Sequence, residues 1–297
     1  MEMFANLHMH TTHSDGIYSP SEIVRVAKAE GYKAVAKADH DTATGYDELA
    51  EACKKEGLES LFAAEFTAWY MLPERKGVHI VAFEFDPQYP PMKDYLAKMS
   101  ENKAYNTRMC FEEGLETGNI SGITWQEVLD AHPGITWLCN NHVFAAMKAK
   151  GLVKQEDYMA WYLKNFSKQC YKYHGKHKVN ELKDMVKLIK DAGGIAVMAH
   201  PFEYLDDVDY YIACGIEGIE VWHPDLSPEL KEKAYKIALE KNLYISGGCD
   251  HSGLCGGLYS SYPTEEELKA SHHYIEPLSV GTTEQYFREI KERKLMR

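Results

Sequence analysis

Short apolar runs alternate with amphipathic stretches along the first 87 residues. An apolar run of strand length begins at Phe4, and the segment behind it carries the signals of a helix start. Ser19-Pro20-Ser21-Glu22 offers a capping serine, a proline at the first helical position and a capping-box glutamate, and Gly31 can end the helix. The predicted strands are 4–8, 34–38, 61–67 and 78–85, and the predicted helices are 19–31 and 46–56.

Between residues 88 and 178 the pattern becomes mainly helical. Thr124-Trp125-Gln126-Glu127 predicts a second capping box. The helices expected in this segment are 95–113, one from Thr124, one after Asn141, and 158–166. Alternation then resumes: the later strands are 195–199, 218–222 and 243–246, and the later helices are 182–192 and 228–241.

About seven strands are therefore each followed by a helix or an insertion. Repeated βα units imply a parallel sheet, and this many units predict a closed or nearly closed barrel. We expect an α/β fold, a distorted (β/α)7 TIM-like barrel. Its two parts are residues 1–87 and 179–297, and residues 88–178 form an inserted helical subdomain.

The composition is that of an ordinary folded domain. Hydrophobic residues make up 45% and charged residues 26% of the 297 residues, which argues against disordered and fibrous classes. The formal net charge of −12 argues against broad binding to duplex DNA, which needs a basic face. It allows a small phosphorylated substrate, because bound cations would reverse the local potential. The seven cysteines form no CxxC pair, so a disulfide framework is not expected.

Targeting signals are not evident in the sequence. No apolar run approaches the roughly 18 residues that a membrane-spanning helix needs. The first six residues lack the basic and apolar regions of a secretory signal. We therefore expect a cytoplasmic protein that has no membrane partner.

Histidines and carboxylates recur in or just after the predicted strands. The carboxyl ends of barrel strands converge on one face, so these side chains would meet there. His8 and His10 stand two positions apart in a strand and project to the same side. Imidazoles and carboxylates without thiolates suit Zn²⁺, Mn²⁺ or Fe, and the number of ligands predicts two or three divalent ions that share a bridging carboxylate. The residues in such positions are His8, His10, Asp15, Asp39, His40, Glu65, His79, His200, Asp250 and His251.

The remaining histidines lie outside this pattern. We expect them to be ordinary hydrogen-bonded residues of the surface or core. They are His13, His132, His174, His177, His223, His272 and His273.

The order of these motifs resembles the PHP (polymerase and histidinol phosphatase) superfamily of metal-dependent phosphoesterases. The resemblance opens with an HxHT strand end and an SDG turn, followed by the capped helix, and it continues to residue 252. The matching segments are Leu7 to Gly16, Ala38-Asp39-His40-Asp41, Ala63 to Thr67, His79-Ile80-Val81, Ala199-His200-Pro201-Phe202 and Gly248-Cys249-Asp250.

The resemblance implies roles for these residues. One cation would be held by His8, His10, Glu65 and Asp250. A second would share Glu65 and add His79 and His200, and a third would take Asp15, His40 and His251. Apart from the resemblance, we expect whichever of His200 and His251 is not committed to metal to protonate the leaving group, and Asp39 and Asp41 to orient imidazoles.

Two departures from the family pattern affect these roles. The last motif usually reads Asp-x-His, whereas here His251 directly follows Asp250 and Ser252 takes the usual histidine position. The family's Arg-Pro-His reads Asn140-Asn141-His142, so an arginine is missing. We expect Arg108 and His142 to contact the substrate phosphate.

The predicted reaction is metal-dependent hydrolysis of a phosphomonoester. The resemblance favours a small nucleotide, such as a 3′,5′-bisphosphate, or the 5′ end of a short oligonucleotide as substrate. Tyr95, Tyr105, Trp125 and Trp137 could stack on a base or simply pack in the core. Two alternatives remain: an amidohydrolase-like enzyme that cleaves a C–N bond, and a metal-binding regulatory or scaffold protein without turnover.

Overall fold

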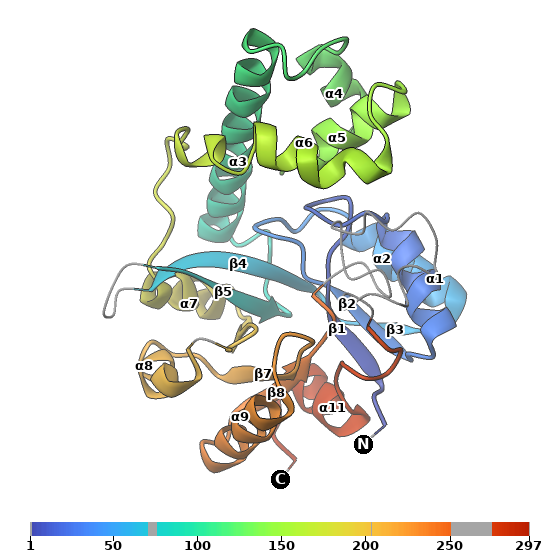
Figure 1. Ribbon diagram of the computed structural model, residues 1–297. Helices are drawn as coiled ribbons and strands as arrows, with labels where there is room; N and C mark the ends of the chain where they lie inside the picture. Colours follow the sequence, from blue (N-terminus) through green and yellow to red (C-terminus); the bar gives the residue numbers. More distant parts are fainter. Residues whose placement is uncertain (1, 71–75, 203, 251–274, 297) are drawn as a thin grey trace.

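The computed structural model describes residues 2–70, 76–202, 204–250 and 275–296, and its strands form two sheets (Figure 1). The first sheet has the order β1-β2-β3 and is parallel throughout. The second has the order β4-β5-β6-β7-β8. The strands are β1 (Ala5–Met9), β2 (Ala34–Lys37), β3 (Glu59–Ser60), β4 (Ala63–Tyr70), β5 (Lys76–Phe83), β6 (Ile195–Met198), β7 (Gly218–Trp222) and β8 (Tyr244–Gly247).

Strand β5 runs antiparallel to both of its neighbours, β4 and β6. The sequence pattern predicted a parallel sheet, and this prediction is wrong at β5. Only residues 71–75 separate β4 from β5. Adjacent antiparallel strands can be joined by such a short link, whereas a parallel pair needs a crossover of a dozen or more residues.

Backbone contacts join the two sheets at both ends. At one end, the Leu61 amide donates to Val35 and the Glu65 amide donates to Asp39. At the other end, the Asp250 amide donates to the carbonyl of His8 at 2.8 Å. This approach requires Gly248, because a Cβ there would stand 2.3 Å from the backbone nitrogen of His8. The chain segments after β2 and β8 therefore lie beside the functional residues of β1 and β4.

The buried apolar side chains form one cluster between the sheets and another under the helices. Small residues of β1, β2, β4, β5 and β6 share the first cluster, which Phe287 and Ile290 complete. These two come from α11, a helix that the pattern of apolar positions did not reveal. The helices of this part are α1 (Pro20–Glu30), α2 (Tyr46–Glu56), α7 (Leu182–Asp191), α8 (Val208–Ala213), α9 (Pro228–Glu240) and α11 (Glu284–Glu292).

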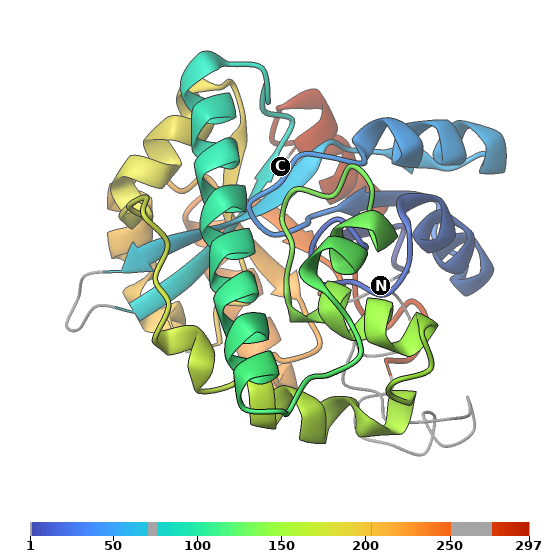
Figure 2. The same ribbon diagram turned by 90° about the horizontal axis from the view of Figure 1, so that it is seen from above.

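The segment between β5 and α7 is helical, as predicted, and lies over one side of the strands (Figures 1 and 2). Its long first helix begins in the main core through Met92, Tyr95 and Met99. The later helices pack around a cluster of their own that includes Phe111, Phe144 and Trp161. The helices are α3 (Pro90–Glu116), α4 (Trp125–Ala131), α5 (Asn140–Ala149) and α6 (Tyr158–Asn165).

The helix-start signals in the sequence act as predicted. Ser19 and Glu22 form a capping box at α1, and Thr124 and Glu127 form one at α4. Among the described residues, no helix is long and apolar enough to cross a membrane.

Candidate metal centre

The two histidines of the HxH motif lie side by side at the end of β1. Their Nε2 atoms are 3.3 Å apart, and both side chains are almost fully buried. Asp250, which follows β8, reaches both of them, with Oδ1 3.2 Å from His8 Nε2 and 2.9 Å from His10 Nε2. The ends of the first and last strands thus contribute to one cluster.

Glu65 of β4 lies at the centre of the site. Its Oε1 atom is 3.0 Å from His79 Nδ1 and 3.0 Å from His200 Nε2. Its Oε2 atom is 3.0 Å from His40 Nδ1 and 3.5 Å from the Nε2 atoms of His8 and His10. One carboxylate therefore faces imidazoles from several strands, which is the arrangement expected of a bridging ligand.

Asp15 and His40 form the outer edge of the site. Asp15 lies 3.4 Å from His10 Nδ1 and 3.6 Å from His40 Nε2, and its side chain is 37% exposed. The ring of Trp137 stacks on His40 with centroids 5.6 Å apart, and the Nζ atom of Lys103 lies 4.5 Å from the centre of the Trp137 ring. The sequence did not single out Lys103 as a cation close to the site.

Two of the site residues have an unusual backbone conformation. His200, after β6, has a φ of 27°, and Asp250, after β8, has a φ of 57°. Non-glycine residues rarely adopt positive φ, and such strain is concentrated at functional sites. The turns after β6 and β8 hold this conformation and aim both side chains at the cluster.

Strand β7 and the residue directly after it supply two side chains that the sequence prediction missed, Glu220 and His223. Glu220 Oε1 lies 3.0 Å from His8 Nδ1, and Glu220 Oε2 accepts the amide of His200. His223 was expected to be an ordinary core or surface histidine, yet its Nε2 lies 3.2 Å from Oδ2 of Asp250. Its Nδ1 accepts the amide of Asp225, so Nε2 carries the proton and donates to Asp250. His223 therefore holds a predicted ligand in place.

Asp39, expected to orient an imidazole, makes no direct hydrogen bond to one among the described residues; it binds the turn after β1, where Ser14 lies between it and His10. It accepts hydrogen bonds from the amide and hydroxyl of Thr11 and from the hydroxyl of Ser14. Lys37 donates to it at 2.7 Å, and both members of this ion pair are fully buried. Asp41 likewise accepts a backbone amide, that of Thr67.

The carboxylates and imidazoles of the site shift one another's pKa. Burial would raise the pKa of Glu65, but His79, His40 and His8 outweigh it and hold the pKa of that carboxyl well below its usual range. Burial would lower the pKa of His8, but Glu220, Asp250 and Glu65 outweigh it and raise that pKa well above its usual value. The buried carboxylates of the cluster therefore favour positive charge beside them.

This donor set fits divalent cations. Among the described residues, Oε2 of Glu65 is buried and accepts no hydrogen bond, although ring nitrogens surround it. A cation among these atoms would satisfy that oxygen, and imidazole and carboxylate ligands suit Zn²⁺, Mn²⁺ or Fe. Five groups of described residues have ligand atoms within 4.8 Å of one another: His8–His10–Glu65–Asp250, His40–Glu65–His79, His10–Asp15–His40, His8–Glu220–His223 and His223–Asp225–Asp250.

The two residues predicted to bind phosphate do not lie free at the cluster. Arg108 is an exposed residue of α3 and pairs with Glu112 one turn later. His142 is buried, and its two ring nitrogens contact the backbone amide of Cys139 and the carbonyl of Thr12. His251, predicted as a ligand and proton donor, lies outside the described residues.

Most of the aromatic residues considered for base stacking serve in packing. Tyr95 and Trp137 are each 6% exposed, and Trp125 packs on Phe111 in the helical cluster. Tyr105 is 40% exposed. Burial thus favours core packing over base stacking for three of the four.

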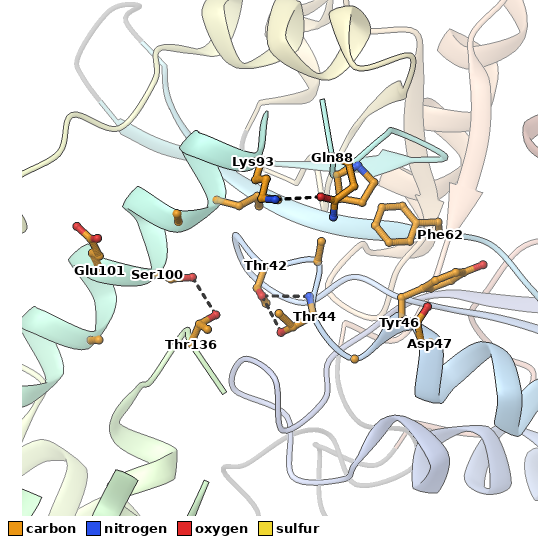
Figure 3. Close-up of a pocket in the computed structure, with 16 residues that line it drawn as sticks. Thr42, Thr44, Tyr46, Asp47, Phe62, Gln88, Lys93, Ser100, Glu101 and Thr136 are labelled. Atoms are coloured by element: carbon orange, nitrogen blue, oxygen red, sulfur yellow. Dashed lines mark hydrogen bonds between the residues drawn. The ribbon is translucent and has the colours of Figure 1, made fainter. Parts of the chain in front are cut away.

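A groove of about 970 Å³ lies between α3 and the turn after His40 (Figure 3). Tyr46 and Phe62 give it an aromatic wall, and Lys93 is the one lysine or arginine among its lining residues. Two of its lining residues adjoin the site in sequence: Thr42 stands two positions after His40, and Thr136 precedes Trp137.

Comparison with known proteins decides the family. The family model for the PHP domain matches residues 6–171, and a 5′-3′ exoribonuclease of Haemophilus influenzae is 31% identical over 84% of this chain and 90% of its own length. The chain belongs to the PHP domain family. A 3′,5′-nucleoside bisphosphate phosphatase of Chromobacterium violaceum is 28% identical over 82% of this chain and 86% of its own length.

A solved structure has the same fold as this PHP chain. It comes from Bifidobacterium adolescentis and is described as a candidate metal-dependent phosphoesterase. It aligns with a TM-score of 0.74 and 28% identity, covering 98% of this chain and 96% of the other. The predicted class, a hydrolase of the metal-dependent phosphoesterases, is confirmed at the level of the PHP family.

Proposed function

We propose that this protein hydrolyses a phosphomonoester of a small nucleotide, or of the 5′ end of a short oligonucleotide, with two or three divalent cations. The observation that carries the proposal is the position of Glu65, whose two oxygens face His79 and His200 on one side and His8, His10 and His40 on the other. A bridging carboxylate among imidazoles suits adjacent cations that act on one phosphate.

The proposed ligands fall into three groups. One cation takes His8, His10, Glu65 and Asp250, and the second takes Glu65, His79 and His200. The third takes Asp15 and His40, with His251 predicted and His10 adjacent in the structure. Mn, Zn and Fe are the candidate metals. Such cations supply Lewis acidity toward water and toward the phosphoryl oxygens.

The chain's own residues hold this ligand set in place. Glu220 fixes the ring of His8, His223 fixes Asp250, and Asp39 fixes the turn that leads to Asp15. His200 serves as a ligand rather than as a proton donor, because its Nε2 faces Glu65. His251 lies outside the described residues and is the predicted donor to the leaving group only where it does not bind the third cation.

Lys103 takes the place proposed earlier for Arg108 at the substrate phosphate. Burial would raise the pKa of Asp15, but His40, His10 and Lys103 outweigh it and lower that pKa, so the charge of Lys103 acts at the outer edge of the site. Lysine binds phosphate as a point charge. Lys103→Met should therefore raise KM more than it lowers kcat.

The groove beside α3 suits the uncharged part of a nucleotide. Its aromatic wall and hydroxyl groups can take a base and a sugar, while its single lysine gives little attraction for a chain of phosphates. This favours a mononucleotide over an oligonucleotide. Ala97→Phe would fill the groove, so KM should rise for nucleotides but not for p-nitrophenyl phosphate.

The proposal extends to the fold: the two sheets form a distorted (β/α)7 TIM-like barrel, and residues 88–178 form an inserted subdomain that covers the barrel mouth and selects the substrate. The backbone hydrogen bonds that join the sheets support this arrangement. A cytoplasmic location is also part of the proposal.

The direct test is phosphatase activity of Asp15→Ala and Glu65→Ala, with Asp94→Ala of the α3 surface as control. The substrates are p-nitrophenyl phosphate, nucleoside 3′,5′-bisphosphates, 5′-phosphorylated oligonucleotides and amides, each with Mn²⁺. Both site variants should lose turnover and the control should keep it. Unchanged turnover in both would overturn the mechanism. Amide hydrolysis would support the C–N hydrolase, and a metal-loaded protein inert toward all substrates would support the regulatory alternative.

A further inference from the structure

The start of helix α5 contacts the turn that carries Asp15. Three side chains near the first turn of α5 donate to consecutive parts of this turn. His142 Nε2 donates to the carbonyl of Thr12 at 2.9 Å, and Asn141 Nδ2 donates to the carbonyl of Asp15 at 2.8 Å. The thiol of Cys139 donates to the carbonyl of Ser14 at 3.3 Å. The inserted helices and the turn after β1 are therefore joined by backbone-directed hydrogen bonds.

His142 has a fixed protonation pattern. Its Nδ1 accepts the amide of Cys139 at 2.9 Å, so the ring proton is on Nε2, where it is donated to Thr12. The side chain is 3% exposed, and burial lowers its pKa to about 4. A neutral ring with both nitrogens used holds the backbone and is not available to a substrate phosphate.

Asn141 is oriented just as firmly. Its Oδ1 accepts hydrogen bonds from the hydroxyl of Tyr158 at 2.6 Å and from Nδ2 of Asn140 at 2.8 Å. Asn140 also donates to the Tyr158 hydroxyl. These contacts leave Nδ2 of Asn141 facing the carbonyl of Asp15. A proline, which the family pattern has at this position, could not make this contact because it has no side-chain donor.

The turn needs this support at its far end. Asp39 holds its near end through Thr11 and Ser14. Beyond them, Asp15 is the most exposed carboxylate of the predicted ligands, and it stands 3.4–3.6 Å from His10 and His40. Its place in the group His10–Asp15–His40 depends on the backbone of residues 12–15, which α5 fixes.

We propose that Asn141 and His142 are positioning residues that hold Asp15 toward His10 and His40, so that the inserted helices complete one divalent-cation site. This inference rests on the proposed function, because it assigns that group to a cation. In this inference His142 contacts the turn of residues 12–15, and not the substrate phosphate as the sequence predicted.

Manganese binding to the full chain tests the inference. Chelator-treated protein is titrated with Mn²⁺, and bound ions are counted by electron paramagnetic resonance. The variants are Asn141→Ala, His142→Phe and His142→Gln, of which the last retains an amide donor toward Thr12. Asn106→Ala is the matched control, since Asn106 Nδ2 also donates to backbone carbonyls, those of Cys170 and Tyr173, within the inserted helices.

Asn141→Ala and His142→Phe should each lower the affinity for one of the bound Mn²⁺ ions by about 10–100-fold. The loss of residues that orient metal ligands has an effect of this size. His142→Gln should recover part of the affinity, and Asn106→Ala should bind as wild type does. In Asn141→Ala and His142→Phe, kcat should fall more than KM rises. Wild-type affinity for every equivalent in folded Asn141→Ala would overturn the inference.

Thermal unfolding of the metal-free variants shows whether each one still folds. A folded variant with weaker Mn²⁺ binding then reports on the position of Asp15. If His142→Phe does not fold, Asn141→Ala decides the question, because it truncates one side chain at the edge of α5, losing the contact with Asp15 together with those to Tyr158 and Asn140. A loss in Asn106→Ala equal to that in Asn141→Ala would also overturn the inference. Failure of wild-type protein to bind Mn²⁺ at all would instead count against the proposed function.

Discussion

His8 Nδ1 lies 3.0 Å from Oε1 of Glu220, and both side chains are buried. This contact favours a ring proton on Nδ1 of His8, so that Nε2, which faces Glu65 and Asp250, is the nitrogen that would bind a cation. The second oxygen of Glu220 accepts the amide of His200 at 2.8 Å. One carboxylate of β7 therefore orients a predicted ligand within β1, His8, and one that follows β6, His200.

Replacing Glu220 by Gln should weaken cation binding by about 10–100-fold, the usual effect of losing a group that orients a ligand. The glutamine side chain lacks the negative charge that favours hydrogen-bond donation from Nδ1 of His8. Mn²⁺ titration measures the change. Glu217→Gln, just before β7 and paired with Lys190 at the surface, should bind Mn²⁺ as wild type does. Equal affinities in both variants would show that Glu220 does not orient His8.

Removing Lys37 should destabilise the fold strongly. Lys37 and Asp39 are both fully buried, and Lys37→Met would leave Asp39 as a buried charge without its partner. Such losses cost about 3–5 kcal/mol in the free energy of unfolding. Urea unfolding of metal-free protein measures this. The double variant Lys37→Met/Asp39→Asn should recover part of the loss, and a single variant as stable as wild type would contradict the prediction.

Acid should destabilise the metal-free protein through His142. Its pKa is lowered by burial to about 4 in the folded state, while an unfolded histidine titrates near 6.5. Since the unfolded state binds the proton more tightly, the contribution of His142 is complete above about pH 6.5 and is lost as pH falls toward 4. The loss is about 3 kcal/mol at most.

Urea unfolding between pH 4.5 and 7.5 measures this effect. The stability of His142→Gln should depend less steeply on pH than that of wild type, because glutamine does not titrate. Parallel pH profiles for the two proteins would contradict the assignment.

Phe287 closes one side of the cluster between the sheets. It is fully buried among residues of both sheets, so Phe287→Ala should cost about 3–5 kcal/mol in the free energy of unfolding. Differential scanning calorimetry should show a lower Tm, with Leu163→Ala, 57% exposed in α6, as a nearly neutral control. A Tm equal to that of the control would mean that α11 is not part of the main folding unit.

The gathering of the candidate ligands could be predicted because their pattern is local. His8 and His10 stand two positions apart at the end of β1, Asp15 lies in the turn that follows, and His40 comes soon after β2, so period and position suffice. The antiparallel orientation of β5 could also have been predicted, because the link of residues 71–75 is too short for a crossover between parallel strands.

The supporting residues were harder to find. Glu220 and Lys37 stand in the apolar runs Gly-Ile-Glu-Val-Trp and Ala-Val-Ala-Lys. A charge inside a buried strand must be paired, and that was the one available signal. The partners of His142 and His223 depend on how α5 and β7 meet the rest of the fold, and no local pattern encodes such contacts. Asn141 was passed over because an asparagine at a helix start usually acts as a cap.

His10 and Asp250 are 240 positions apart in the chain, yet they contact each other in the site. During synthesis, a ribosome-bound nascent chain holds the first histidines long before the aspartate is translated. The proposed cation group that contains both residues can therefore be complete only after residue 250 has been translated.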